Sequence, residues 1–179
     1  MRKIWLITLI IFNIIVISGL GQEAEYQIKA IFLEQFTRFI EWPVSSSLSD
    51  TSRSFIVAVI GENPFDSILE QTYARQKIKH KKVEIRYLSS PDEIKDIHLL
   101  FISGSCKTIL PEIINQTKDE PILTVSDTEG FAENNVLINF YLAGEKIKFE
   151  INEKAVHESG LSISYILLNL SKIVNPIKR

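Results

Sequence analysis

The sequence predicts an α/β domain with a mainly parallel sheet flanked by helices, followed by a C-terminal antiparallel hairpin and a closing helix. Two observations lead to this prediction. Continuous apolar runs, typical of strands buried on both faces, alternate with segments of helical periodicity, as in parallel sheets. Later in the chain, two β-rich runs flank Ala143-Gly144, where glycine supplies the positive φ that a tight hairpin turn needs.

The first helix is predicted over Glu25–Glu41, because apolar residues recur there at steps of three and four. Pro43 disfavours the α conformation in the residue before it, so Trp42 marks the exit from this helix. The polar segment Ser45–Ser54 has no periodicity and is expected to be a surface loop. Ser54–Gly61 then forms the first buried strand.

A second helix is predicted to begin with Asn63 as N-cap and Pro64 in the first turn, and to continue through Tyr73. Lys82–Leu88 alternates apolar and charged residues, which indicates a strand with one exposed face, suited to a sheet edge. Pro91–Lys95 is expected to form a short helix. These segments supply the next strand–helix unit of the domain.

The following unit repeats this order. Leu99–Ile102 is a second buried run, and the loop Ser103–Ser105 is expected to cap a helix over Lys107–Thr117. Pro121–Val125 is the last of the buried runs before the hairpin. The alternation of strands and helices therefore continues as far as Val125.

The hairpin strands are predicted over Val136–Leu142 and Lys146–Ile151. In the second strand Lys146, Lys148 and Glu150 alternate with apolar residues, so these three side chains are expected on the exposed face.

The C-terminal segment is expected to be helical. Glu153–Ser159 is predicted to be a short helix that Gly160 interrupts. The apolar residues of Ile163–Val174 recur at helical spacing and predict the closing helix, which Pro176 ends.

The N-terminal segment has the pattern of an export signal. Two basic residues precede the apolar run Ile4–Ile17, and small residues follow it as far as Gly21. We therefore predict a cleaved signal peptide at residues 1–21 and a single α/β domain at 22–179. The alternative is an uncleaved membrane anchor, because the apolar segment approaches the shortest length that spans a bilayer.

Composition argues against several classes of protein. The 179 residues are 45% hydrophobic and carry a net charge of −2, and the longest basic run, Lys79–Lys82, is interrupted by His80. This argues against a nucleic-acid partner. Cys106 is the only cysteine, so we expect no internal disulfide and a structural thiol. His98 and His157 are distant from His80 in the sequence, and no spacing indicates a metal site or cofactor.

Three loops are expected to meet at the carboxyl ends of the parallel strands, where open α/β sheets bind ligands. They are Gly61–Asp66, Ser103–Cys106 and Ser126–Phe131. Their candidate polar side chains are Glu62, Asn63, Ser103, Ser105, Asp127 and Glu129. The Ser-Gly-Ser loop could hold an anion through backbone N–H groups, but the same residues can serve only as caps and turns.

No catalytic constellation is evident. The chain has no G-x-S-x-G or phosphate-binding motif. Ser126 with Asp127, or Ser105, would be the nucleophile of a hydrolase, but no base is paired with them in the sequence. His157 is expected on the surface of a polar helix. We therefore predict that the protein is not an enzyme.

Several segments together resemble the YfiR/HmsC-like family. The resemblance extends from about Glu25 to Val174. Its motifs are F-x-x-F-x-E-W-P, S-D-x-x-G-F-A, and F-E-I-N followed by S-G-L-x-I-S. The segments that carry it are Lys29–Pro43, Phe55–Phe65, Leu99–Ser105, Ile122–Phe140 and Lys146–Ser164.

The resemblance implies a periplasmic, non-catalytic α/β regulator. Such a protein would bind the periplasmic sensor region of a membrane-bound diguanylate cyclase and repress cyclic-di-GMP synthesis, and so restrain biofilm formation. The family also implies that a homodimer is possible. Some relatives depend on cysteine pairs, which the lone Cys106 cannot form within this chain.

A regulator that works by contact needs an exposed apolar patch with polar groups around it. The candidate partner-binding residues are Phe39, Trp42, Phe65 and Phe131, with Glu41 and Glu150 for polar specificity. The alternative function is a periplasmic small-molecule-binding sensor module that acts on another membrane signalling partner. That module would bind its ligand in the three strand-end loops.

Overall fold

The computed structural model describes residues 21–50 and 52–177. The predicted signal peptide therefore lies, except for Gly21, outside the described residues. None of the helices in the described ranges is long and apolar enough to cross a membrane.

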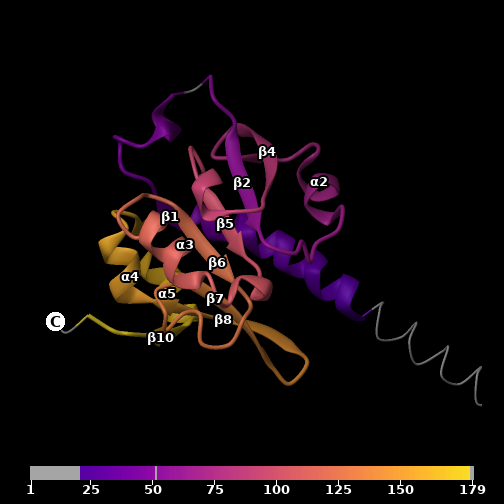
Figure 1. Ribbon diagram of the computed structural model, residues 1–179, viewed down its shortest axis with the longest axis vertical. Helices are drawn as coiled ribbons and strands as arrows, with labels where there is room; N and C mark the ends of the chain where they lie inside the picture. Colours follow the sequence, from indigo (N-terminus) through magenta and orange to yellow (C-terminus); the bar gives the residue numbers. More distant parts are fainter. Residues whose placement is uncertain (1–20, 51, 178–179) are drawn as a thin grey trace, which may run out of the picture.

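An eight-stranded sheet forms the centre of the molecule, in the order β10-β8-β7-β6-β5-β2-β4-β3 (Figure 1). The pairs β4–β2, β2–β5, β5–β6 and β6–β7 are parallel, whereas β7 and β8 form an antiparallel hairpin. The predicted fold class is thus confirmed. The strands are β2 (Phe55–Ile60), β3 (Lys77–Ile78), β4 (Lys81–Leu88), β5 (Leu99–Ile102), β6 (Leu123–Ser126), β7 (Ile138–Ala143), β8 (Lys146–Asn152) and β10 (Lys172–Val174).

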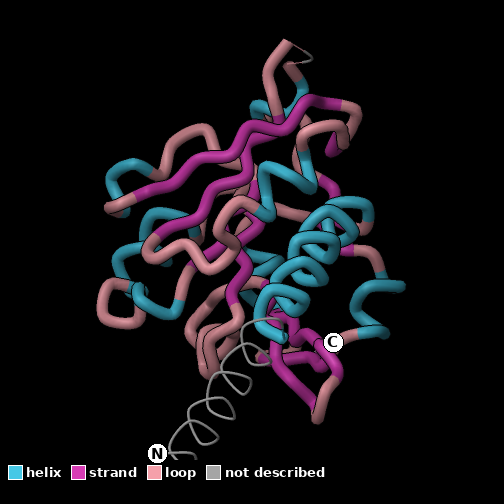
Figure 2. The backbone as a smooth tube through the Cα atoms, turned by 90° about the vertical axis from the view of Figure 1, so that its right-hand side faces the viewer, coloured by secondary structure: helices cyan, strands magenta, loops and turns pink. Residues whose placement is uncertain are grey.

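Helices cover both faces of this sheet (Figure 2). The helical residues 21–38 and α2 (Ile68–Tyr73) pack on one face, together with α4 (Glu153–Glu158) and α5 (Tyr165–Leu170). The helix α3 (Leu110–Thr117) packs on the opposite face. Alternate residues of β2 belong to the two separate apolar clusters, because successive side chains of a strand point to opposite faces.

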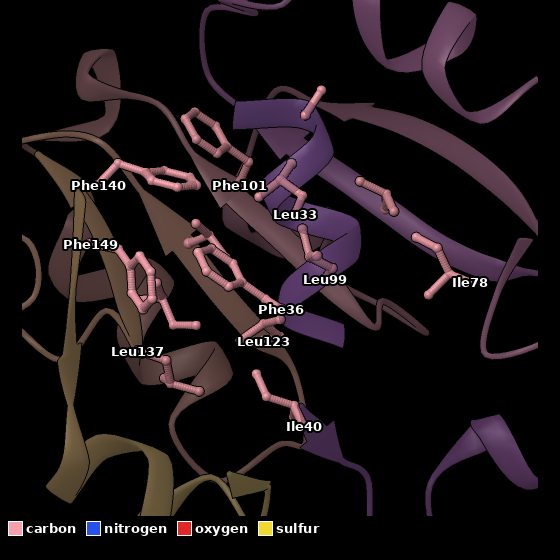
Figure 3. Packing of buried hydrophobic residues seen from close by; sticks show 14 of the residues in the cluster. Leu33, Phe36, Ile40, Ile78, Leu99, Phe101, Leu123, Leu137, Phe140 and Phe149 are labelled. Atoms are coloured by element: carbon pink, nitrogen blue, oxygen red, sulfur yellow. The ribbon is translucent and has the colours of Figure 1, made fainter. Parts of the chain in front are cut away.

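The N-terminal helix is anchored by an aromatic cluster (Figure 3). The Phe36 ring stacks on Phe140 at 5.4 Å and meets Phe149 edge to face at 5.0 Å between centroids. Phe32 lies against all three rings. The helix therefore packs directly onto the β7–β8 hairpin.

The predictions for the first helix and for the closing helix both need correction. The first helix ends at Arg38, and Ile40–Glu41 forms the strand β1, which pairs with β9 (Ser162–Ile163). The predicted closing helix over Ile163–Val174 is wrong at both ends, which together make up half of its length. Only α5 is helical, because Ser164 caps its first turn and the chain after it adds β10 to the edge of β8.

Two helix starts also lie later than predicted. Asn63 accepts a hydrogen bond from the Phe65 N–H in a local turn, and Asp66 has a φ of +48°, so α2 begins only at Ile68. The 3₁₀ turn η3 (Gly104–Cys106) precedes α3, which begins at Leu110. Short polar side chains at these positions satisfy backbone groups in turns as well as in helix caps.

We predict that Phe36→Ala lowers the free energy of unfolding by about 3–5 kcal/mol, because it leaves a cavity among three aromatic rings. Urea unfolding measures the change. Ile31→Ala on the same helix is the control, since Ile31 is exposed and its loss should cost less than about 0.5 kcal/mol. Equal effects of the two substitutions would contradict the packing described here.

Candidate functional site

The first two strand-end loops meet as predicted. The Glu62 N–H donates to Ser105 Oγ at 2.9 Å, and Ser105 Oγ donates to Ser103 Oγ at 3.2 Å. A Cβ on Gly61 would lie 2.5 Å from both Cys106 Sγ and Ser105 Oγ, and the φ of Gly61 is +89°. Glycine is therefore required here by close approach as well as by backbone conformation.

The third loop closes against the second. A Cβ on Gly104 would lie 2.9 Å from Thr128 Oγ1. Ser126 Oγ is fully buried, donates to the Ile102 carbonyl at 2.8 Å and accepts from the Thr128 N–H at 3.3 Å. These hydroxyls are used in backbone and loop contacts, as expected of turns and caps. No base contacts Ser126 or Ser105 among the described residues, so the hydrolase alternative gains no support.

Asp127 is bound by the N-terminal helix, which the sequence did not predict. Its Oδ2 accepts hydrogen bonds from Tyr26 Oη at 2.7 Å and Lys29 Nζ at 2.5 Å. Lys29, almost completely buried, also pairs with Glu25 at 2.5 Å and lies 4.3 Å from the Tyr26 ring centroid. Burial raises the pKa of Tyr26, and the hydrogen bond to Asp127 raises it further.

This ionic cluster, Glu25, Tyr26, Lys29 and Asp127, joins the start of the first described helix to the end of β6. A buried ammonium between two carboxylates is stabilised only while its partners remain. The spacing of Glu25 and Lys29 by four residues and of Tyr26 and Lys29 by three indicates a shared helix face. Nothing in the sequence pointed from that face to Asp127.

The predicted aromatic pair at the end of the helix lies at a surface corner. The Trp42 corner comprises Glu41, Trp42, Pro43, Val44, Leu48 and Lys79, which line a hollow of about 390 Å³. Trp42 packs edge to face on Phe55 at 5.7 Å, while Lys79 Nζ lies 5.6 Å from its ring centroid. Val44 is 90% exposed. Burial lowers the pKa of Lys79, and the charge of Glu41 offsets part of this shift.

The other candidate docking residues are mostly internal. Phe65 and Phe131 are buried in the two core clusters, so neither side chain is a surface contact in this structure. Phe39 is half-buried against the core. The expectation that Glu150 lies on an exposed face is wrong, because it is 5% exposed and bound by Asn139 and by Lys172 at 3.0 Å.

The remaining side chains with potential chemistry are Cys106 and His157. Cys106 is buried, and burial raises the pKa of its thiol. Within residues 21–50 and 52–177, no group of His, Cys, Asp and Glu side chains is arranged to hold a metal ion. His157 is exposed on α4.

His98 is a buried polar residue whose role the sequence did not reveal. The Ile56 N–H donates to its Nδ1 at 2.9 Å, so the neutral ring carries its proton on Nε2 and donates to Ser47 Oγ at 2.9 Å. This tautomer cannot act as a base for Ser47. Burial, followed by the charge of Lys81, lowers the pKa of His98 to about 4. His98 therefore fastens the loop after β1 to the sheet.

Comparisons with known proteins agree with the fold. The model of the family described as YfiR/HmsC-like matches residues 26–172. Among solved structures, an ABC domain from Streptococcus pneumonia in complex with L-Trp matches with a TM-score of 0.52 and 12% identity. The match covers 79% of this chain and 62% of that one, less than two thirds of its length. The search of curated proteins found no match.

We predict that Asp127→Ala lowers the free energy of unfolding by about 3 kcal/mol, because it removes one of two carboxylates from a buried ammonium. Denaturant unfolding measures this loss. Glu129→Ala, an exposed change in the same loop, should cost less than about 0.5 kcal/mol. A cost for Asp127→Ala no greater than that of the control would refute a stabilising role for the cluster.

We also predict that stability falls in mild acid. The unfolded pKa of histidine is about 6.5 and the folded pKa of His98 is about 4, so the unfolded state binds more protons between these values. The contribution is fully present above pH 6.5 and is lost as the pH falls toward 4, with about 2 kcal/mol gone at pH 5. His98→Gln should remove this part of the pH dependence. An unchanged pH profile in that variant would show that other groups cause it.

Proposed function

The chain belongs to the YfiR/HmsC-like family, and from that premise we propose that it is a periplasmic, non-catalytic regulator. It binds the periplasmic sensor region of a membrane-bound diguanylate cyclase and represses cyclic-di-GMP synthesis. The observation that carries this proposal is the family match over residues 26–172, which extends from the N-terminal helix to the start of β10. A match of that extent concerns the entire folded body rather than one motif.

The chemistry of the strand-end loops supports a regulator without catalysis. The hydroxyls of Ser103, Ser105 and Ser126 are bound to backbone groups and to one another. Asp127 is occupied by Tyr26 and Lys29. These groups serve as contacts within and between the loops, as is common for side chains of turns and caps.

The location follows from the N-terminal segment. In our proposal residues 1–21 direct export and are cleaved, and residues 22–179 form the mature domain. A lone buried Cys106 fits an exported protein that relies on its core rather than on a disulfide. Retention of the apolar segment as an anchor would leave the domain in the same compartment.

The Trp42 corner is the surface we propose for contact with the cyclase. It combines a projecting apolar side chain, Val44, with an aromatic ring and the charges of Glu41 and Lys79. Interfaces commonly place such an aromatic anchor inside a polar rim. Phe39, three residues before Trp42 in the sequence, is half-buried and packs against the core.

A small-molecule-binding sensor module is the second proposal. The similar ABC domain was solved in complex with L-Trp, so a related fold can hold a small ligand. In this chain the ligand would bind in the hollow of the Trp42 corner, or beside the first strand-end loop, where Pro64 and Asp66 line a hollow of about 470 Å³.

Co-purification with the periplasmic region of a membrane diguanylate cyclase from the same cell tests the first proposal. Deletion of the chain should raise cyclic-di-GMP, and Val44→Glu should weaken the complex about tenfold without changing the unfolding free energy. Leu142→Glu, which makes the same apolar-to-acidic change at an exposed residue of the hairpin, is the control.

A normal cyclic-di-GMP level after deletion would exclude the cyclase proposal. If Leu142→Glu rather than Val44→Glu releases the cyclase, the function stands but the surface is the hairpin. A rise in melting temperature with L-Trp, lost in Trp42→Ala, would favour the sensor module, because a ligand of the native state stabilises it.

A further inference from the structure

The outer edge of β4 is largely unpaired. On one side β4 pairs with β2 from Val83 to Leu88. On the other side β3 pairs only with Lys81 and Lys82. In Figure 1, β4 lies at the margin of the sheet beside α2. The edge from Val83 onward therefore has no strand partner along most of the strand.

The direction of the backbone groups on this edge follows from two hydrogen-bonding patterns. The Leu88 carbonyl accepts from the Gly61 N–H, so Leu88 and alternate residues before it direct their backbone groups toward β2. Lys81 lies opposite Ile78 across the two-residue turn of the β3–β4 hairpin, so it directs its groups toward β3. Val83, Ile85 and Tyr87 consequently present their N–H and C=O groups outward.

A cleft of about 520 Å³ runs along the open edge. Its apolar lining comes from Val83, Ile85 and Tyr73, which are packed against the core of the molecule. The Tyr73 hydroxyl donates to the Ala30 carbonyl at 2.6 Å, so this wall is fixed to the N-terminal helix. The cleft offers pockets for side chains next to a row of unpaired backbone groups.

Three cationic side chains line the cleft. Arg75, Lys77 and Lys82 line it and are exposed, and none of the ion pairs in the described part of the chain includes them. The one carboxylate of the lining, Glu70, accepts a hydrogen bond from the Tyr87 hydroxyl at 2.6 Å. In a chain whose net charge is −2, this rim is a local positive field.

We propose that the edge of β4 is a docking site for an extended acidic segment of a partner protein, which adds to the sheet as a strand. Strand addition derives affinity from the backbone ladder and specificity from alternate side chains in pockets. Here apolar side chains would enter the cleft beside Val83 and Ile85. Acidic side chains would meet Arg75, Lys77 and Lys82.

The positive charges at this edge favour an acidic partner over a second copy of this chain. Lysines on an open edge prevent its pairing with the same edge of a second copy, because like charges would be brought together. An acidic strand meets no such repulsion and gains from the field. This site is separate from the Trp42 corner and does not require the partner to be a cyclase.

The test uses the protein in the form the cell produces and a capped seven-residue peptide in which Glu alternates with Val. Fluorescence anisotropy should show saturable binding that weakens about tenfold at about 0.5 M NaCl. Lys77→Glu with Lys82→Glu should weaken binding by about tenfold or more. Lys107→Glu with Lys118→Glu is the control, because it makes the same change in net charge at exposed positions by α3.

Amide hydrogen exchange supplies the second readout. In the free protein the amides of Val83, Ile85 and Tyr87 should exchange fast, while those of Glu84 and Arg86 are protected by β2. The peptide should protect the first three. A peptide N-methylated at alternate residues keeps its charge but cannot form the ladder, so it should bind far more weakly.

Three results would overturn the inference. They are equal binding of the N-methylated peptide, equal weakening by the control variant, and binding to phosphatidylglycerol vesicles but not to the peptide. The assay contains no cyclase, so its failure leaves the proposed function to its own experiment. Protection of the three outward amides by the acidic peptide would support strand addition directly.

Discussion

The burial of β2 on both faces is the constraint on which the rest of the structure depends. Every residue of Phe55–Ile60 is buried, and its side chains divide between two apolar clusters. A strand in that position must be covered by helices on each face, because its backbone and side chains are both removed from water. The N-terminal helix and α3 provide that cover from segments that are far apart in the sequence.

The same constraint brings the strand-end loops into contact. Gly61 follows β2 directly and allows Ser105 and Cys106 to approach within a distance that any side chain would prevent. The hydroxyls that meet there bind one another, and the Lys29–Asp127 pair joins them to the helix. At the place where α/β sheets commonly bind ligands, these polar groups are thus engaged with one another. The two surfaces proposed for recognition, the Trp42 corner and the edge of β4, lie at the margins.

Two such margins differ in chemistry. The Trp42 corner presents an apolar side chain and an aromatic ring beside mixed charges, whereas the edge of β4 presents unpaired backbone groups among cations. Lys79 and His80, which both have positive φ, form the turn between β3 and β4. Lys79 also lies over the Trp42 ring, so this turn connects the two surfaces. A partner that contacted one surface would lie close to the other.

The sequence by itself determined the mainly parallel sheet, the alternation of strands and helices along the chain, and the hairpin, because continuous apolar runs and Gly144 leave few alternatives. It also indicated the family through motifs such as the one ending at Trp42 and Pro43. It misplaced Glu150 and the chain after Ile163, because alternation within one strand does not reveal which neighbour will cover it. Only the tertiary structure decided those positions.

The candidate site divides in the same way. Local patterns placed Ser103, Ser105 and Asp127 in strand-end loops, since turn residues after buried runs are recognisable from sequence. The attachment of Lys29 to Asp127 joins residues 98 positions apart, and no local pattern predicts such a pair. The open edge of β4 likewise exists only because β3 is two residues long and pairs with so little of its neighbour. Contacts between distant segments set both features, so only the folded chain could reveal them.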